Sequence, residues 1–590
     1  MSVIPRLLLL AALLCSIPPA TCAPVAASAV PWLRDEAAAF ELARHERRFV
    51  LLYLEAVWCH WCHVMDARTY ADEGVIAALA RDYVPLRIDQ DARPDLANRY
   101  RDYGWPATIV FDPEGREIVK RQGYIAPLPM QRLLAAIKAD PDPERAAARV
   151  AVDDTPASGL GATVRAELQR RHLDTYDDER GGLRIDQKYV DRDSVEYALG
   201  LAARGDVAQG LAARKTLDAA RALLDPAWGG VYQYSTGGDW NHPHFEKLAV
   251  LQAEYLRLYA LAYAQTGEAR YRDVARSIRG YIEHFLAAPE GGYYASQDAD
   301  LRPGEHSAEY FALDDAARRR QGVPRVDTHR YTQATAAIAE AYAVLHEASD
   351  DAAALAAAER AMRWVHAERA NGEGGFRHDA NDRGGPFLAD NLAAGRAFLQ
   401  LYRVTAQREW LTEAGATADF IERRFRSDAG YAGGVGGAGP IAPVAQLDEN
   451  LSLARFANLL AHYSGEARHQ ALAQHAFAYL ARDTVALSRL TDAGILLADD
   501  ERNADPLHLT VIGGKRDPLA RALFDAALRL PGAYKRLDWW DRAEGVLPNP
   551  DVKCPPVKGA AAFVCTRRRC SLPIREPAEL AAFVREAASD

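Results

Sequence analysis

Short apolar runs alternate with helix-periodic segments in the first quarter of the chain. Apolar runs at 49–54, 83–89 and 104–111, with a shorter one at 117–121, have the length and composition of buried strands. The segments 64–80, 95–103 and 128–139 instead repeat their apolar positions with the period of a helix. Residues 112–115, Asp-Pro-Glu-Gly, form a turn signal. This order predicts an α/β domain over residues 33–140.

The pattern changes after a charged, proline-bearing linker at 141–158. From 159 to 504 the chain is alanine-rich and almost wholly helical by period. Gly-Gly pairs recur at 181, 229, 291, 374 and 433, separated by 48, 62, 83 and 59 residues. Each interval is long enough for a helical hairpin, so this region is expected to be a repeat of such hairpins, with the glycine turns at one end.

A third pattern occupies residues 505–590. Strands are expected at 507–512 and 561–566, and helices at 517–530 and 577–588, which makes a small α/β lobe. Gly513-Gly514-Lys515 is too short for a phosphate-binding loop and is interpreted as a turn.

The first residues indicate export. A short basic start is followed by eleven apolar residues, Leu7 to Ile17, and then by small residues ending at Ala23. This is the pattern of a secretory signal peptide, assigned to residues 1–23, with an uncleaved anchor as the alternative. The mature protein is therefore expected in the periplasm or outside the cell, without a membrane span.

Composition narrows the class further. Hydrophobic residues make up 49% and charged residues 26%, as in ordinary globular proteins. Lys+Arg minus Asp+Glu is 71 − 81 = −10, and no basic stripe is present, so no nucleic-acid partner is expected. Arg567-Arg568-Arg569 is interpreted as a solvated loop.

The cysteines form two groups after the signal segment, which holds Cys15 and Cys22. Cys59 and Cys62 stand at the predicted start of a helix, whereas Cys554, Cys565 and Cys570 lie near the end of the chain. In an exported protein the second group is expected to hold one structural disulfide and one further thiol, although exchange with Cys59 stays open.

The Cys59-His60-Trp61-Cys62 spacing favours thiol–disulfide exchange. A helix N-terminus stabilises the thiolate of Cys59, and a cationic His60 would add to that effect. Cys59 is therefore the expected nucleophile, and Cys62 the thiol that resolves a mixed disulfide.

Three other interpretations of the pair are compatible with its spacing. Cys59-x-x-Cys62-His63 is also a haem c attachment motif, with Met65, Met130 or Met362 as the axial ligand. Zinc would need Cys59, His60, Cys62 and His63 crowded into five residues. An inert structural disulfide is the third. No metal and no cofactor is assigned.

The segment as a whole resembles a thioredoxin-like domain, on the evidence of Trp58 before Cys59, the helix after it and Trp105-Pro106-Ala107-Thr108. The resemblance implies that Pro106 is cis and faces the cysteines. Thioredoxins carry a buried acid six residues before the first cysteine, whereas this chain has Tyr53 there. Glu55 shares the strand face of Tyr53 and is a doubtful substitute.

The helical region resembles the (α/α)6 toroid of six-hairpin glycosidases and N-acylglucosamine epimerases. Pro243-His244-Phe245-Glu246-Lys247, Asp298-Ala299-Asp300, Asp390-Asn391 and Asp448-Glu449-Asn450, with the Cys59 segment, resemble the spermatogenesis-associated thioredoxin-like proteins. The fold class implied is multidomain: an α/β thioredoxin-like domain, an all-α (α/α)6 toroid and a small C-terminal α/β lobe.

Polar residues of the toroid are candidates for substrate binding. Paired carboxylates could act as general acid and base in sugar chemistry, with a tryptophan as stacking platform. Alternating His242, His244 and Glu246 could hold a metal or ligand, although capping roles explain many such residues. The substrate-binding candidates are Asp239, Trp240, His242, His244, Glu246, Asp298, Asp300 and Asp390.

The sequence thus predicts an exported thiol–disulfide oxidoreductase whose toroid binds a substrate or partner. Its partner would be a protein thiol or disulfide, or a small molecule such as a sugar. The alternatives are a carbohydrate-active enzyme, epimerase- or glycosidase-like, on a thioredoxin-like scaffold, and a non-catalytic interaction protein.

Overall fold

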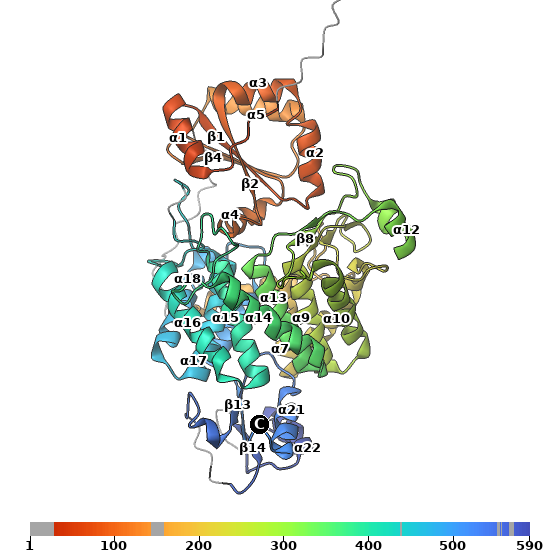
Figure 1. The fold of residues 1–590 in the computed structure, drawn as a ribbon, viewed down its shortest axis with the longest axis vertical. Coiled ribbons are helices and arrows are strands. Elements are labelled where there is room, and N and C mark those ends of the chain that lie inside the picture. Colours follow the sequence, from red (N-terminus) through yellow and green to blue (C-terminus); the bar gives the residue numbers. More distant parts are fainter. Residues whose placement is uncertain are drawn as a thin grey trace, which may run out of the picture.

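The computed structural model arranges the chain as three parts along its longest axis (Figure 1). It describes residues 29–142, 159–436, 439–551, 555, 557–565 and 571–589. The expected signal peptide and residues 143–158 of the expected linker lie outside the described residues. A thioredoxin-like domain is at one end, a helical toroid is in the middle, and the C-terminal lobe is at the other end. The predicted fold class is confirmed.

The thioredoxin-like domain is a four-stranded sheet in the order β2-β1-β3-β4, covered by helices on both faces. β1 pairs parallel with β2 and antiparallel with β3, and β3 pairs antiparallel with β4. The elements are α1 (Glu36–Glu46), β1 (Phe49–Glu55), α2 (His60–Arg68), α3 (Glu73–Asp82), β2 (Tyr83–Asp89), α4 (Pro94–Tyr100), β3 (Ala107–Phe111), β4 (Glu117–Gln122) and α5 (Pro127–Ala139).

The side chains of β1 alternate between two hydrophobic cores, one on each face of the sheet. Leu51 and Tyr53 pack with α2, α3 and α5, whereas Val50, Leu52 and Leu54 pack with α1 and α4. The single helix expected over 64–80 is two helices, because Asp72 caps α3 by accepting a hydrogen bond from Val75 N at 3.0 Å.

Six inner helices form a closed ring in the toroid, since each contacts the next and α20 contacts α7. The inner helices are α7 (Arg192–Ala203), α9 (Ala249–Thr266), α13 (Thr332–Ser349), α15 (Leu388–Thr405), α17 (Leu447–Ser464) and α20 (Ala493–Asn503). The outer helices that pack against them are α6 (Ala162–Asp174), α8 (Val207–Ala220), α10 (Ala269–Tyr281), α14 (Ala352–Arg369), α16 (Arg408–Phe425) and α18 (Ala467–Leu480).

The glycine turns join each outer helix to the next inner one. In four successive repeats, the backbone N–H just after the turn donates to a side chain near the start of that inner helix: Val231 to Gln252, Tyr293 to Thr335, Phe376 to Asn391, and Tyr431 to Asn450. The fifth turn is centred on Gly430 rather than on the expected Gly433-Gly434, since Gly430 precedes Tyr431 in the β10–β11 hairpin (Arg426–Ser427 and Gly430–Tyr431). Asn391 and Asn450 therefore have a structural role.

The axis of the toroid is lined by charged side chains, one from each inner helix. Glu196 binds Arg257 and Arg455, each at 2.6 Å, and Arg455 also binds Glu501 at 2.7 Å. Arg396 pairs with Glu340 at 2.8 Å on the other side. The cavity between them measures about 100 Å³, well below the roughly 300–1,000 Å³ of typical ligand pockets.

The C-terminal lobe closes the opposite end of the ring from the thioredoxin-like domain. Its sheet has the order β13-β12-β14, in which β12 (Leu507–Ile512) is parallel to β13 (Lys535–Trp540) and antiparallel to β14 (Ala561–Cys565). The helices are α21 (Pro518–Leu528) and α22 (Pro577–Ser589). Lys535 joins the lobe to the toroid through Glu347 at 2.7 Å.

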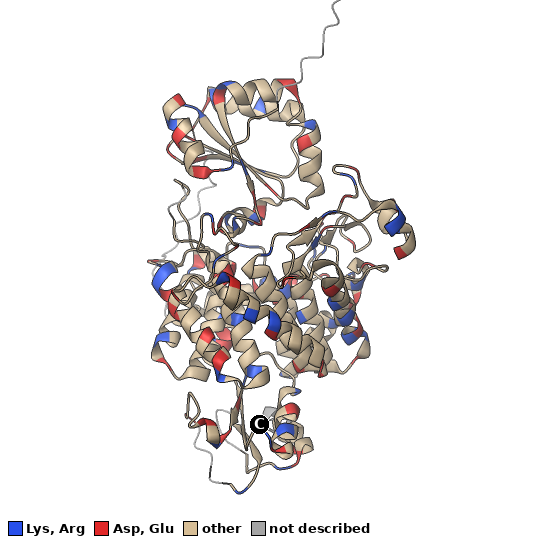
Figure 2. Ribbon diagram, viewed as in Figure 1, with Lys and Arg blue, Asp and Glu red and all other residues tan. Residues whose placement is uncertain are grey.

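Acidic and basic residues are scattered along the ribbons of all three parts (Figure 2). Among the residues that the structure describes, none of the helices combines the length and the apolar character that crossing a membrane requires.

Candidate functional site

The cysteine pair stands at the N-terminus of α2, in the loop that follows β1. Cys59 is the N-cap residue, and its Sγ accepts a hydrogen bond from Cys62 N at 3.1 Å. The two cysteines are joined as a disulfide with Cα atoms 5.3 Å apart. Pro106, preceded by a cis peptide bond, comes just before Ala107, which pairs with Leu54 at the same edge of the sheet.

A loop of the toroid covers this pair. Cys59 is 3% exposed and Cys62 is fully buried. The loop follows β8 (Ser296–Gln297), and its Ala299 N lies 3.4 Å from the carbonyl oxygen of Trp58. Reagents in solution therefore reach Cys59 poorly while the two parts are docked.

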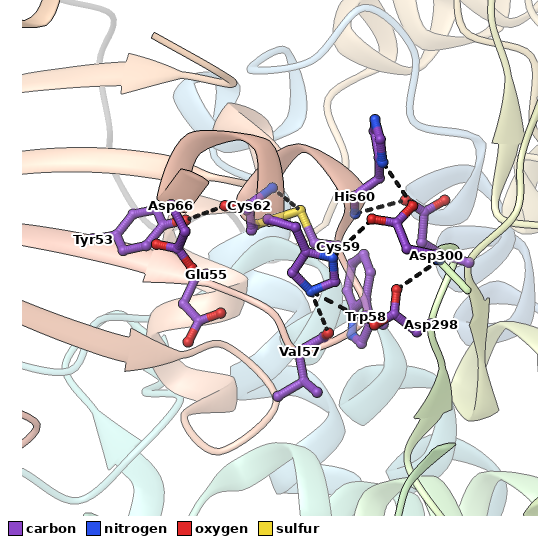
Figure 3. The surroundings of a disulfide bond; sticks show 12 residues. Tyr53, Glu55, Val57, Trp58, Cys59, His60, Cys62, Asp66, Asp298 and Asp300 are labelled. Atoms are coloured by element: carbon purple, nitrogen blue, oxygen red, sulfur yellow. Dashed lines mark hydrogen bonds and ion pairs between the residues drawn. A yellow bond between two sulfur atoms is a disulfide. The ribbon is translucent and has the colours of Figure 1, made fainter. Parts of the chain in front are cut away.

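Asp300 binds both histidines of the cysteine motif (Figure 3). Its Oδ1 is 2.7 Å from His60 Nδ1, and its Oδ2 is 3.0 Å from His63 Nδ1. The opposite ring nitrogen of His63, Nε2, lies 3.1 Å from the carbonyl oxygen of Val57 and 3.7 Å from Asp298 Oδ2. Glu246 Oε1 accepts a longer hydrogen bond, 3.4 Å, from His60 N at the start of α2.

The electrostatics of this junction follow from burial and from these contacts. Burial opposes ionisation of Asp300, but hydrogen bonds from His60 and His63 outweigh it and lower the pKa of Asp300 to about 2. Burial also disfavours the charged form of His63, which on its own would lower the pKa of this histidine. The hydrogen bond to Asp300 and the nearby charge of Asp298 outweigh burial and raise the pKa of His63. Burial raises the pKa of Asp298 to about 6 and that of Glu246 to about 7.

At the position of the buried acid that thioredoxins carry, this chain has a tyrosine. Tyr53 is fully buried, and its hydroxyl donates to the carbonyl oxygen of Cys62 at 3.1 Å. Glu55 accepts from Arg87 at 2.8 Å, and Arg87 also binds Asp66 at 2.8 Å. The side chain of Glu55 is therefore paired with Arg87 rather than with either cysteine.

A second contact region lies beside Trp58. The indole N–H of Trp58 donates to Asp91 Oδ2 at 2.8 Å. His378 of the toroid connects Asp91 to Asp390, with Nε2 at 2.8 Å from the Asp91 carbonyl oxygen and Nδ1 at 2.9 Å from Asp390 Oδ2. Burial raises the pKa of Asp91 to about 7. Asp390 thus orients a histidine at the junction.

Four of the toroid candidates lie on one β-hairpin, where each has a local partner. Asp239, Trp240 and His242 belong to the turn between β5 (Tyr234–Ser235) and β6 (Pro243–His244). Trp240 is buried and donates to the Arg180 carbonyl oxygen at 3.0 Å, so its ring is not an open stacking platform.

The other two side chains of that hairpin also have local partners. His242 Nδ1 lies 3.0 Å from Asp239 Oδ1. His244 stacks on Tyr234 at 4.3 Å, and burial lowers its pKa to about 4. His242, His244 and Glu246 therefore do not converge on one point as expected for a shared ligand.

The C-terminal lobe lies far from the redox pair (Figure 1). Cys565 ends β14, is buried and is disulfide-bonded. Cys554 and Cys570 lie outside the described residues. The lobe is at the opposite end of the toroid from the thioredoxin-like domain (Figure 1), which argues against exchange between Cys565 and Cys59 within one chain.

Several residues of the junction were missed by sequence reasoning. Asp91 and His378 carry no local motif, and their contact joins positions 287 residues apart. His63 was considered only with the cysteines, whereas its partners come from the toroid. Asp298-Ala299-Asp300 was recognised as a signature, and that was the available signal for this contact.

A thioredoxin-like domain docked by its Cys-x-x-Cys face on the mouth of an (α/α)6 toroid defines the class of this protein. A family model described as Thioredox_DsbH, Protein of unknown function, DUF255, matches residues 23–138. The chain is homologous to spermatogenesis-associated protein 20. It is 27% identical to the protein from Homo sapiens over 308 aligned positions, and the match covers 46% of this chain and 39% of that relative.

Solved structures similar to the chain include sugar-isomerising enzymes. A sugar epimerase from a ruminal bacterium matches 54% of this chain and 86% of its own, with 14% identity and a TM-score of 0.44. A D-mannose isomerase matches 58% of this chain and 98% of its own, with 12% identity and a TM-score of 0.44.

Proposed function

We propose that the protein is a thiol–disulfide oxidoreductase whose redox pair is Cys59 and Cys62. The observation that carries the proposal is the placement of Cys59 Sγ at the N-cap of α2, bonded to Cys62 and accepting from Cys62 N. A helix N-terminus favours a thiolate there.

The exchange is a balanced two-electron reaction. The Cys59 thiolate attacks a substrate disulfide, forming one sulfur–sulfur bond and releasing one substrate thiolate. The Cys62 thiolate then attacks Cys59 Sγ, which restores the Cys59–Cys62 disulfide and releases the second substrate thiolate. The substrate gains two electrons, and a dithiol reductant must return them to the protein.

A thiol-trapping titration in glutathione buffers tests this proposal on the full chain. Mass spectrometry should follow Cys59 and Cys62 separately from the C-terminal cysteines. A reversible couple between about −270 and −120 mV is expected, and Cys59→Ser should abolish exchange while the fold persists. A pair that stays oxidised well below about −300 mV would identify a structural disulfide and favour the non-catalytic interaction protein.

The toroid serves in this proposal as the docking partner of the redox pair. A carbohydrate-active centre on the toroid axis is less favoured, because the axial cavity of about 100 Å³ is crossed by ion pairs. At the mouth, Glu246, Asp298, Asp300 and Asp390 contact the thioredoxin-like domain or the histidines at the junction.

Export is part of the same proposal and is supported by the apolar segment Leu7 to Ile17. Expression in a bacterial host, followed by fractionation and N-terminal sequencing, tests it. A mature chain that begins shortly after residue 23 in the periplasmic fraction is expected. An intact N-terminus in the cytoplasm would overturn this part alone.

A further inference from the structure

His63 has an acceptor at each of its two ring nitrogens. Nε2 faces the carbonyl oxygen of Val57 at 3.1 Å, and Nδ1 faces the carboxylate oxygen Oδ2 of Asp300 at 3.0 Å. A neutral imidazole has one N–H and can satisfy one of them. Either the ring is doubly protonated, or Nδ1 and Asp300 share a bound cation.

We propose that His63, Asp298 and Asp300 form an interdomain site for a divalent transition metal such as Zn²⁺. One ligand atom from each of the three residues lies within 4.8 Å of the others. Imidazole nitrogen with two carboxylates is a donor set that Zn²⁺ accepts, and bonds of about 2.0–2.2 Å would draw these atoms closer together. The ligands come from α2 and from the loop after β8.

The contact of Val57 supports this site independently of the carboxylates. A histidine that binds a metal usually donates its other ring N–H to a carbonyl or carboxylate, which fixes the tautomer and the ring orientation. The carbonyl oxygen of Val57 occupies that position at Nε2, so Nδ1, beside Asp300, is left as the metal-binding nitrogen. Asp298 Oδ2 is 3.7 Å from Nε2 in this structure, so its side chain must turn toward Nδ1 to complete the site. His60 Nδ1, at 2.7 Å from Asp300 Oδ1, orients the carboxylate from the other side.

An unpartnered carboxylate oxygen adds a second indication. Glu246 is 3% exposed, and its Oε2 has no hydrogen-bond partner among the described residues. Its Oε1 accepts from the backbone N–H of His60 at 3.4 Å, and the ring of the same histidine binds Asp300. A buried, unsatisfied oxygen is costly, and a cation beside Asp300 would reduce that cost.

This metal site differs from a cysteine-based zinc site. The sulfurs of Cys59 and Cys62 are bonded to each other, so neither is a ligand. The ligands are the imidazole of His63 and the carboxylates of Asp298 and Asp300, which come from two domains. The site is consequently independent of the proposed redox reaction. A Cys59→Ser/Cys62→Ser variant should keep the metal, which separates failure of this proposal from failure of the redox function.

The test uses the oxidised full chain, stripped with a chelator and dialysed against ZnCl₂. Metal analysis should give one Zn²⁺ per chain, and calorimetry should give the same stoichiometry. Co²⁺ in place of Zn²⁺ should produce visible absorption. Asp298→Asn with Asp300→Asn should abolish binding, and His63→Gln alone should weaken it at least tenfold.

The matched control is the exposed pair Asp239 and His242, which has the same two group types 3.0 Å apart. Asp239→Asn with His242→Gln should leave the stoichiometry at one. Absence of bound Zn²⁺ and Co²⁺ in the natural protein would overturn the proposal and identify His63 as an imidazolium. Unchanged binding in His63→Gln, which needs no removal of a buried carboxylate, would overturn it as well.

Discussion

His60 and Asp300 are 240 positions apart in the chain and 2.7 Å apart in the structure. The contact joins the residue after the first cysteine to the loop of the toroid that covers the pair. Because Asp300 also binds His63, one carboxylate fastens the N-terminal turns of α2 to the toroid. Access to Cys59 therefore depends on whether this contact is made.

Asp300→Asn should make Cys59 more accessible to large reagents. Loss of the charged hydrogen bonds costs about 1.5–3 kcal/mol, so the undocked population should rise roughly tenfold or more. The measurement is the ratio of alkylation rates of reduced Cys59 by a polymer-linked maleimide and by a small maleimide. Taking the ratio removes changes in the intrinsic reactivity of the thiol.

Asp239→Asn is the control for that experiment, because Asp239 lies in an exposed turn away from the cysteines. Its rate ratio should match that of the natural protein. If Asp300→Asn also left the ratio unchanged, Asp300 would not control access to Cys59.

Glu449 should make the stability of the junction depend on pH between about 4.5 and about 8. It is buried at the start of α17 and accepts from Asn98 of the thioredoxin-like domain at 3.0 Å. Burial raises the pKa of Glu449 to about 8, from 4.5, with Asp95, Asp448 and Asp390 adding to the effect. Between pH 4.5 and pH 8, Glu449 therefore keeps its proton in the folded state and has lost it in the unfolded state. The free energy of unfolding consequently falls as the pH rises from about 4.5 to about 8.

Glu449→Gln should reduce that dependence, because the amide stays neutral. Its Tm should change less between pH 6 and pH 9 than the Tm of the natural protein, and at pH 9 it should be the more stable of the two. Glu466→Gln, at an exposed position on the outer surface, provides the control and should keep the natural pH profile. Parallel profiles for all three proteins would contradict the assignment.

The strands and the cysteine helix could be predicted from the sequence, because local pattern determines them. The run at 49–54 became β1 (Phe49–Glu55), and Cys59 caps α2 as a helix N-terminus requires. The break between α2 and α3 was missed because Asp72, the cap, lies inside an otherwise helical pattern. Strand β13 (Lys535–Trp540) was missed because Lys535, Arg536 and Asp538 look exposed, although each is buried with a charged partner.

The junction could not be predicted in the same way. The Pro243–Lys247 and Asp298–Asp300 segments were recognised as a signature, but which of their side chains would meet the cysteines depends on docking. Glu246, Asp298 and Asp300 reach α2, whereas Asp239 and His242 pair with each other at the surface. Contacts between segments hundreds of residues apart leave no periodicity in the chain.

The axial ion pairs should contribute strongly to stability. Arg455 binds Glu196 at 2.6 Å and Glu501 at 2.7 Å inside the ring of inner helices. Arg455→Met should destabilise the toroid by about 3–5 kcal/mol, because Glu501 would be left as a buried charge without its partner. Arg468→Met, at an exposed pair with Asp419, should cost about 0–1 kcal/mol. Urea denaturation followed by circular dichroism measures both, and equal losses would show that the axial pairs are solvated.

Glycines with positive φ should tolerate a methyl group only where space is available. Gly230 of a glycine turn and Gly267, which caps the C-terminus of α9, have φ of +73° and +69°. A Cβ on Gly230 would lie 2.6 Å from Cγ of Tyr281, whereas a Cβ on Gly267 meets nothing within 4 Å. Gly267→Ala should therefore cost only the strain of the left-handed conformation, about 1–2 kcal/mol.

Gly230→Ala should cost about 1–3 kcal/mol more, since the ring of Tyr281 on the outer helix α10 must move. The difference in Tm between the two alanine variants isolates this steric contribution, because the backbone strain is common to both. Equal Tm values would mean that the turn and the outer helix separate at little cost. The repeated packing of glycine turns against aromatic residues would then not be what holds successive hairpins in register.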